Sequence, residues 1–199
     1  MTKEEEIILA AEEEFFTNGY DASSTAAIAK RAGVTHAMVN YYFRTKERLF
    51  AKILDDHIRE LLKGLKALMM EDGDIVEVSV QTALVIFDKL NEDRRVPYLI
   101  SDISRTHPDF LLQYKETFDT TCRDSIRMHS ERLEKAIAAG KVKPCSMKDI
   151  YNTVLSLSTS PFFNIPLLQN VAGLSPERID SYLKERREEM VRLIRARYQ

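Results

Sequence analysis

Hydrophobic residues recur every three or four positions along most of the chain, which is the spacing of amphipathic helices. A capping box at Thr2 and Glu5 opens the first helix, which Gly19 is expected to end. Further helices are predicted over residues 45–70, 75–91, 97–104, 109–139, 147–169 and 176–197. No segment alternates convincingly as a strand would. The pattern therefore predicts an all-α fold.

The most specific pattern lies between Thr25 and Phe43. Ala29 is small enough to let a second helix approach, and Gly33 suits a turn that needs a left-handed backbone. Thr35 fits the N-cap of the second helix. Apolar side chains then fill the angle between the helices: Ile28, Val34 and Val39. This spacing predicts a helix-turn-helix that presents its second helix to a major groove, with an ordinary αα-hairpin as the alternative.

A set of small, apolar, aromatic and polar residues is distributed through the first fifty residues: Ala11, Phe16, Gly19, Tyr20, Thr25, Ile28, Ala29, Ala32, Gly33, Val34, Thr35, Tyr42, Phe43, Lys46, Glu47 and Leu49. This pattern resembles the N-terminal signature of the tetracycline-repressor (TetR) family. The resemblance implies a homodimer whose helical C-terminal domain binds a small molecule and controls DNA affinity. We therefore expect a three-helix helix-turn-helix DNA-binding domain at residues 1–50 and a helical effector-binding and dimerisation domain at 51–199.

Candidate DNA contacts follow from side-chain chemistry. Thr25, Thr35 and Lys46 stand at predicted helix starts, where hydroxyl, backbone N–H and ammonium groups bind phosphate. Base edges are expected to meet the exposed side of the second helix: His36, Ala37, Met38, Asn40 and Tyr41. By resemblance, Tyr42 contacts the DNA backbone. Asn40 stands where the family often has tyrosine, so no known operator sequence can be transferred.

Charge is distributed unevenly along the 199 residues. The net charge is −2, but residues 22–50 hold five lysines and arginines against one acid. Phosphate contact depends on such local cations rather than on the total. For Lys30 and Arg31, a solvated charged surface is the alternative interpretation. With 44% hydrophobic and 30% charged residues, the composition is that of a globular protein.

An effector pocket is predicted from aromatic residues in the later helices. Phe110, Tyr114, Phe118 and Cys122 recur every four residues, with His129 near the same face. The complete candidate set is Phe87, Tyr98, Phe110, Tyr114, Phe118, Cys122, His129 and Tyr151. The alternative is that these side chains form an ordinary helical core. The set favours an apolar or amphipathic effector.

The last two helices are expected to form the dimer. Ser175-Pro176 opens the final helix. Its apolar stripe must be covered: Ile179, Tyr182, Leu183, Met190, Leu193 and Ile194. The preceding segment contains Pro161 and Pro166, which predict a kink or short break. By resemblance, the two helices pair with their symmetry mates, and the alternative is an intramolecular core.

Other functional classes find little support in the sequence. It lacks the serine-hydrolase elbow, phosphate-binding glycine loop, zinc-protease motif and dinucleotide fingerprint, so no enzyme is predicted. Cys122 and Cys145 form no metal-binding pattern, and we expect free thiols, no metal and no cofactor. No apolar run reaches membrane-spanning length and the N-terminus is acidic, which favours a cytoplasmic protein without a membrane partner.

These expectations combine into one mechanism. The chain is predicted to be a ligand-responsive, DNA-binding transcriptional regulator, a repressor that a small-molecule effector releases from its operator. A two-fold dimer would place two recognition helices about 34 to 36 Å apart, on a near-palindromic site in double-stranded DNA. The alternative is a helical ligand sensor or partner-binding protein that does not bind an operator.

Overall fold

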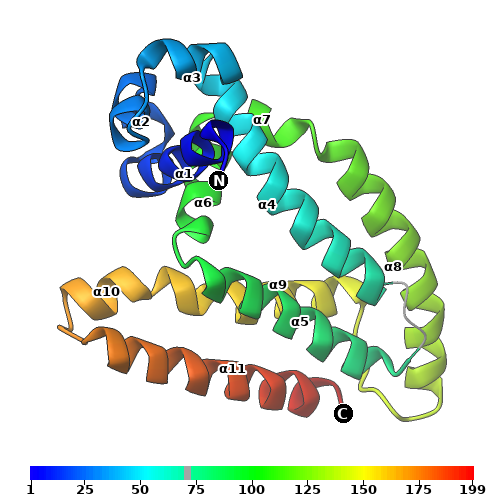
Figure 1. Ribbon diagram of the computed structural model, residues 1–199. Helices are drawn as coiled ribbons and strands as arrows, with labels where there is room; N and C mark the ends of the chain where they lie inside the picture. The colour runs from blue at the N-terminus through cyan, green and yellow to red at the C-terminus, as the bar shows by residue number, and fades with distance from the viewer. Residues whose placement is uncertain (70–72) are drawn as a thin grey trace. The chain divides into compact units, whose positions relative to one another are not determined.

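The computed structural model describes residues 1–69 and 73–199, although the side chains of residues 60–69, 117, 118, 121, 122, 124 and 125 are not described. Every regular element within those ranges is a helix, which confirms the all-α prediction (Figure 1). The helices are α1 Lys3–Ala22, α2 Thr25–Arg31, α3 His36–Phe43, α4 Lys46–Met69, α5 Ile75–Glu92, α6 Val96–Thr106, α7 Asp109–Leu112, α8 Lys115–Ala138, α9 Met147–Phe163, α10 Ile165–Asn170 and α11 Pro176–Tyr198.

Most predicted helix boundaries hold, two need correction, and one predicted break is confirmed. The capping box of Thr2 and Glu5 is present, but α1 continues beyond Gly19 to Ala22 after a kink at which Gly19 has φ 77°. The helix predicted over 109–139 is two helices, because the chain turns between α7 and α8. The predicted helix 147–169 breaks at Asn164, two residues before Pro166, as the prolines suggested.

The chain divides into two compact units. The first unit contains Met1–Glu60 and Arg95–Gln113, and the second contains Leu61–Arg94 and Tyr114–Gln199. The helix α4 thus begins in the first unit and continues into the second. The functional division at residue 50 remains a prediction.

An aromatic cluster forms part of the core of the first unit. Phe50 of α4 lies 5.0 Å from Phe15 and 4.7 Å from Tyr20 of α1, measured between ring centroids. Phe110 of α7 completes the cluster at 4.9 Å from Phe50 and 5.0 Å from Tyr20. Because edge-on and tilted aromatic pairs stabilise a core beyond simple burial, these rings fix α1, α4 and α7 together.

Charged contacts also attach α6 to α1. Arg95, which precedes α6, donates to Glu13 at 2.7 Å and lies 5.2 Å from the ring centroid of Phe16. The hydrogen bond and the charge of Arg95 lower the pKa of Glu13. At the other end of α6, His107 Nε2 lies 2.7 Å from Asp21 Oδ1. A segment distant in sequence therefore belongs to the same compact unit as the helix-turn-helix.

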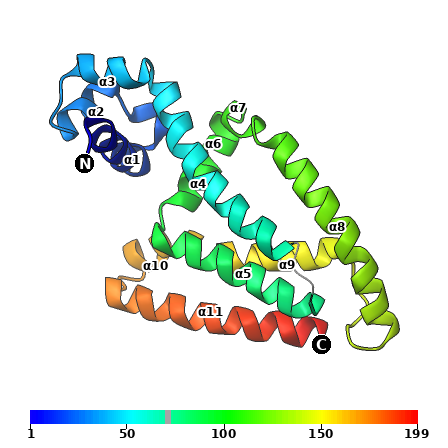
Figure 2. The same ribbon diagram turned by 45° about the vertical axis from the view of Figure 1, so that its right-hand side comes forward.

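The second unit is built around α5, which packs against α9 and α11 (Figure 2). Phe87 of α5 and Phe162 of α9 are both buried, with ring centroids 5.0 Å apart. Two arginines on α11 bind α5 through paired hydrogen bonds, Arg187 to Asp88 and Arg195 to Glu77. These two-pronged contacts set the register of α11 along α5.

The stripe predicted on α11 serves mainly this intramolecular core. Its buried members face the inside of the second unit: Ile179, Leu183, Met190 and Ile194. Leu193 is 45% exposed, and Tyr182 is half-buried. Four of the six residues therefore belong to an intramolecular core, which was the alternative to a dimer interface. A smaller apolar surface remains for a partner.

Candidate DNA-binding site

The turn between α2 and α3 has the predicted construction. Gly33 has φ 64°, the left-handed conformation that favours glycine. The next residue, Val34, donates its N–H to the carbonyl oxygen of Ala29 at 3.0 Å. Ile28 of α2 and Val39 of α3 are both buried beneath the turn. The two helices are thus held at a fixed angle by their backbone and by a small apolar core.

Thr35 caps α3 as predicted. Its side-chain oxygen accepts a hydrogen bond from the N–H of Met38 at 3.2 Å. The other end of α3 was missed by sequence reasoning: Arg44 has φ 63°, although it carries a side chain. A glycine or asparagine would have signalled this turn, whereas arginine gives no such signal.

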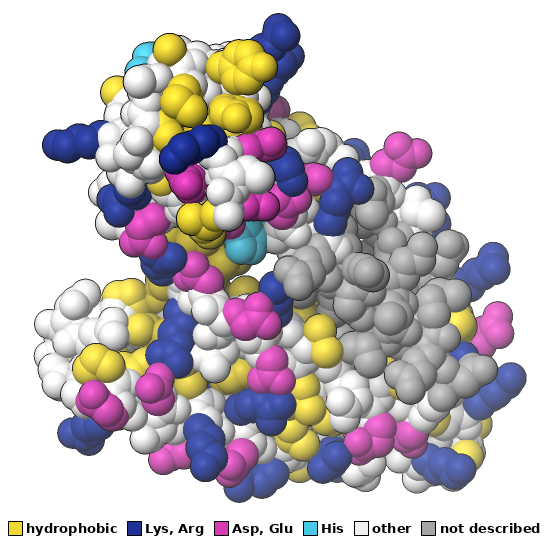
Figure 3. All heavy atoms as spheres, viewed as in Figure 1, with side chains coloured by type: hydrophobic (Ala, Val, Ile, Leu, Met, Phe, Trp, Pro, Cys, Tyr) yellow, Lys and Arg dark blue, Asp and Glu magenta, His cyan; other side chains and the backbone are white. Residues whose placement is uncertain are grey.

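The outer side of α3 presents the predicted contact residues. Exposed positions there are His36, Ala37, Asn40, Tyr41 and Tyr42, while Met38 is half-buried. Tyr41 is 81% exposed, and its ring lies 5.3 Å from that of Tyr42 in an edge-on arrangement. Figure 3 shows hydrophobic side chains at the surface formed by α2 and α3, with Lys and Arg side chains beside them. Exposed aromatic surface of this kind is typical of a binding face.

The predicted phosphate contacts have different surroundings. Thr25 begins α2 and lies half-buried, with Oγ1 2.9 Å from His36 Nε2. Lys46 donates through Nζ to the carbonyl oxygens of Tyr20 at 3.0 Å and Ser23 at 3.1 Å. An ammonium group has three protons, so one remains for a phosphate. The structure thus adds a structural role for Lys46, and its DNA contact stays a prediction.

An ion pair that anchors α2 to α1 was also missed. Arg31 donates to Glu14 at 3.2 Å, and the Glu14 side chain is only 8% exposed. In the sequence Arg31 is a candidate surface cation, because nothing in the local pattern marks Glu14 as its partner. Part of the positive charge counted near the recognition helix is therefore neutralised inside the first unit.

The predicted effector residues fall in both compact units. Tyr98 and Phe110 belong to the first unit, and Phe110 packs in its aromatic cluster. The second unit contains the others whose side chains are described: Phe87, Tyr114, His129 and Tyr151. Of these, Tyr151 is 52% exposed, whereas the other three are buried. Phe118 and Cys122 lie outside the described side chains, and the effector set remains a prediction.

Residues 7–53, which include most of α1, all of α2 and α3 and the start of α4, match the model of the bacterial regulatory proteins of the tetR family. The N-terminal region of the chain is similar to the TetR family. The match covers the turn at Gly33, helix α3 and three of the four rings of the aromatic cluster, Phe15, Tyr20 and Phe50.

Two curated relatives are named as regulators of transcription. YdgC of Bacillus subtilis, an HTH-type transcriptional regulator, is 26% identical over 125 residues, 59% of this chain and 64% of YdgC. FasR of Mycolicibacterium smegmatis, an HTH-type transcriptional activator, is 28% identical over 147 residues, 69% of this chain and 66% of FasR. The chain therefore matches just under two thirds of either relative's length.

A solved structure extends the likeness in fold to the full length of the chain. SCO4942 of Streptomyces coelicolor superimposes with a TM-score of 0.68 at 19% identity, covering 99% of this chain and 98% of SCO4942. At this identity the similarity concerns the fold alone. No helix among the described residues is long and apolar enough to cross a bilayer.

Proposed function

We propose that this protein is a ligand-responsive transcriptional regulator that binds operator DNA through α3. The observation that carries the proposal is the two-sided character of α3. Val39 and Phe43 bury one side, while His36, Asn40 and Tyr41 are exposed on the other. An imidazole and an amide can hydrogen-bond base edges, and the capped, buried side holds them in place.

The surroundings of α3 support contact with phosphate. The hydroxyl of Thr25 and the ammonium of Lys46 each retain hydrogen-bonding capacity beyond their internal contacts. Exposed Lys30 and Arg48 add positive charge in the same compact unit. These groups would position the protein on DNA without reading sequence, whereas α3 would supply specificity.

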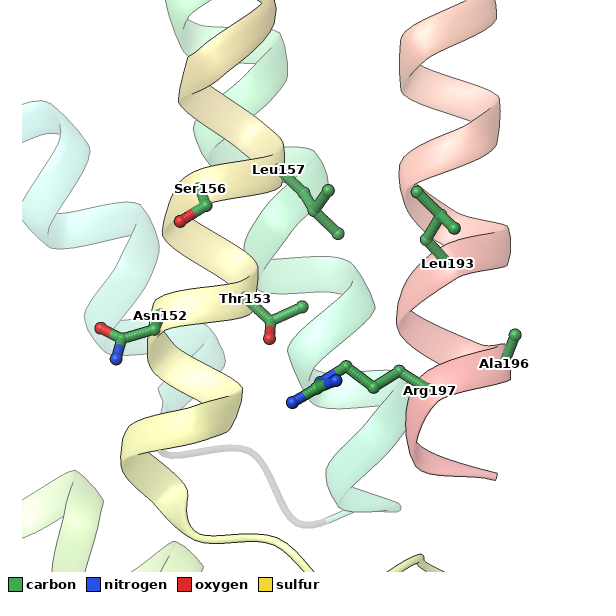
Figure 4. A pocket seen from close by; sticks show the side chains of 7 residues that line it. All are labelled: Asn152, Thr153, Ser156, Leu157, Leu193, Ala196 and Arg197. Atoms are coloured by element: carbon green, nitrogen blue, oxygen red, sulfur yellow. The ribbon is translucent and has the colours of Figure 1, made fainter.

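We further propose that two copies associate through α9, α10 and α11. An open groove runs between α9 and α11, and Figure 4 shows Leu157 and Thr153 directed toward α11, from which Arg197 extends back. Apolar side chains remain exposed along this part of the second unit: Phe163 at 45%, Leu167 at 58% and Leu193 at 45%. A second copy would cover them and supply the two-fold symmetry of a palindromic operator.

In the proposed mechanism a small-molecule effector binds the second unit and changes the affinity for DNA. The coupling between the two ligands is expected to be about 1 to 3 kcal/mol, as in allosteric proteins generally. Because α4 begins beside the recognition helix and continues into the second unit, it is the natural mechanical link. We propose that the protein is a cytoplasmic repressor and that the effector releases it from DNA. FasR is named as an activator, and expression of a reporter gene behind the operator distinguishes repression from activation.

Replacement of Asn40 tests the proposed DNA contact. Asn40→Ala should weaken binding to a selected operator by about 1 to 3 kcal/mol and relax the preference at one base pair. Asn18→Ala is the matched control, because Asn18 is an exposed amide on α1 outside the recognition helix. If the wild type and both variants bind the selected operator equally, and no more tightly than they bind a random duplex, the sensor or partner-binding alternative is favoured.

A further inference from the structure

The side chains of Thr25 and His36 join the first residues of α2 and α3. Thr25 Oγ1 lies 2.9 Å from His36 Nε2, across eleven positions of sequence. Both helix starts are fixed independently of this contact, since Ser24 accepts from the N–H of Ala27 and Thr35 from that of Met38. The Thr25–His36 hydrogen bond therefore acts on the orientation of the imidazole more than on the backbone.

Stability is a poor explanation for this hydrogen bond. His36 is exposed and Thr25 is only half-buried, so water competes for both polar groups. A hydrogen bond between exposed side chains adds little to folding. It does engage one ring nitrogen, so that Nδ1 is the nitrogen left for DNA.

The position of one proton links the two proposed DNA contacts. A threonine hydroxyl has a single proton, and phosphate oxygens only accept hydrogen bonds. If Thr25 donates that proton to a phosphate, it can only accept from His36, and Nε2 must carry the ring proton. A neutral imidazole has one ring proton, so Nδ1 then becomes an acceptor.

We propose that Thr25 is a positioning residue that sets the base preference of His36. With Nδ1 as acceptor, His36 favours a base that offers an amino donor in the major groove, adenine through N6 or cytosine through N4. Without the hydroxyl, either ring nitrogen can carry the proton, and the preference weakens. This inference rests on the proposed DNA-binding function and adds to it a chain of hydrogen bonds that connects phosphate, Thr25, His36 and base.

The experiment measures binding of the full chain to an operator library that contains all four base pairs at each position, at pH 8.5 and constant salt. The base pair facing His36 is the one whose preference disappears in His36→Ala. At that position the wild type should favour one base pair by roughly three- to tenfold, and the preference should depend on the amino group of its adenine or cytosine. Thr25→Ser should retain the preference, and Thr25→Val should reduce it toward that of His36→Ala.

Two controls separate positioning from other effects. Thr17→Val removes an exposed hydroxyl of α1 and should leave every base preference unchanged. In the His36→Ala background, Thr25→Val should cause no further change in preference at the same base pair. Replacing the adenine or cytosine of the favoured base pair by its analogue without the exocyclic amino group should remove the base preference of the wild-type protein, as His36→Ala does. This test does not depend on whether Thr25→Val folds.

The contrary outcomes are distinct. Uniform weakening by Thr25→Val, with the base preference intact, would overturn the positioning role and leave Thr25 as a phosphate contact only. A preference at the His36 position that persists when the exocyclic amino group is removed would overturn the proton assignment. Failure of the wild type to select any sequence would overturn the proposed DNA-binding function itself.

Discussion

Lys46 is bound to Tyr20 through both the main chain and the aromatic ring. Its Nζ donates to the Tyr20 carbonyl oxygen at 3.0 Å and lies 4.3 Å from the ring centroid. A second hydrogen bond reaches the carbonyl oxygen of Ser23. The first residue of α4 thus closes the end of α1, next to the segment that leads into the helix-turn-helix.

Removal of this ammonium should destabilise the first unit. Lys46→Met leaves two carbonyl oxygens without their charged donor, and the free energy of unfolding should fall by about 1 to 3 kcal/mol. Urea denaturation followed by circular dichroism measures the change. Lys30→Met is the matched control, because Lys30 is exposed on α2 and should alter stability by less than about 0.5 kcal/mol. Equal stability of the two variants would contradict the structural role of Lys46.

Alkaline pH should destabilise the fold through Tyr20. Burial, followed by the charge of Glu47, raises the pKa of Tyr20 to about 12. The unfolded chain loses this proton near its ordinary pKa of about 10, so stability present below pH 10 declines as pH rises toward 12. Denaturation at a series of pH values should show a shallower decline for Tyr20→Phe than for wild type. Tyr42→Phe, at an exposed ring, should retain the wild-type slope.

The turn at Gly33 should resist any residue with a Cβ. A side chain at this position would have space, because no heavy atom lies within 4 Å of where its Cβ would be. The φ of 64° would nevertheless strain an L-residue. Gly33→Ala should therefore cost about 1 to 2 kcal/mol of unfolding free energy, and Gly33→Asn should cost less. Gly73→Ala is the control, because Gly73 lacks a positive φ and its added Cβ would make ordinary contact with Val78 at 3.5 Å. A Gly33→Ala protein as stable as wild type would refute the strain.

Stability lost by removing Arg31 should be partly restored by a second substitution at Glu14. Arg31→Met leaves the carboxylate of Glu14 buried without its cation and should cost about 1 to 3 kcal/mol of unfolding free energy. Adding Glu14→Gln removes the buried charge, so the double variant should be more stable than Arg31→Met alone. Additive losses in denaturation experiments would contradict this coupling.

The exposed ion pair of Glu77 and Arg195 provides a comparison for the partly buried pair of Arg31 and Glu14. Hydrogen bonds from Arg195 lower the pKa of Glu77, but both side chains are more than 40% exposed. Glu77→Gln should therefore cost less than about 1 kcal/mol, and the loss should shrink in high salt.

Local chemistry explains which features the sequence could predict. The Thr35 cap, the Gly33 turn and the capping box of Thr2 and Glu5 depend on residues within a few positions of one another. Each leaves a readable pattern because the side chain satisfies a backbone group nearby. The helix-turn-helix and the exposed face of its second helix were accessible for the same reason.

Long-range contacts explain what the sequence did not reveal. Arg95 and Glu13 are 82 positions apart, and Phe110 joins the core of a unit that begins with α1. The helical spacing of Phe110 and Tyr114 fits either a pocket or a core, since periodicity identifies a face but not the element that covers it. The positive φ of Arg44 is likewise not signalled by its residue type.

Selection from a randomised DNA duplex pool, at fixed moderate salt, tests the central claim most directly. Protein refolded to remove any bound ligand should recover a near-palindrome whose half-sites lie about 34 to 36 Å apart. The recovered site should bind at least about a thousandfold more tightly than random duplex. A folded dimer that enriches no sequence would contradict operator recognition by α3.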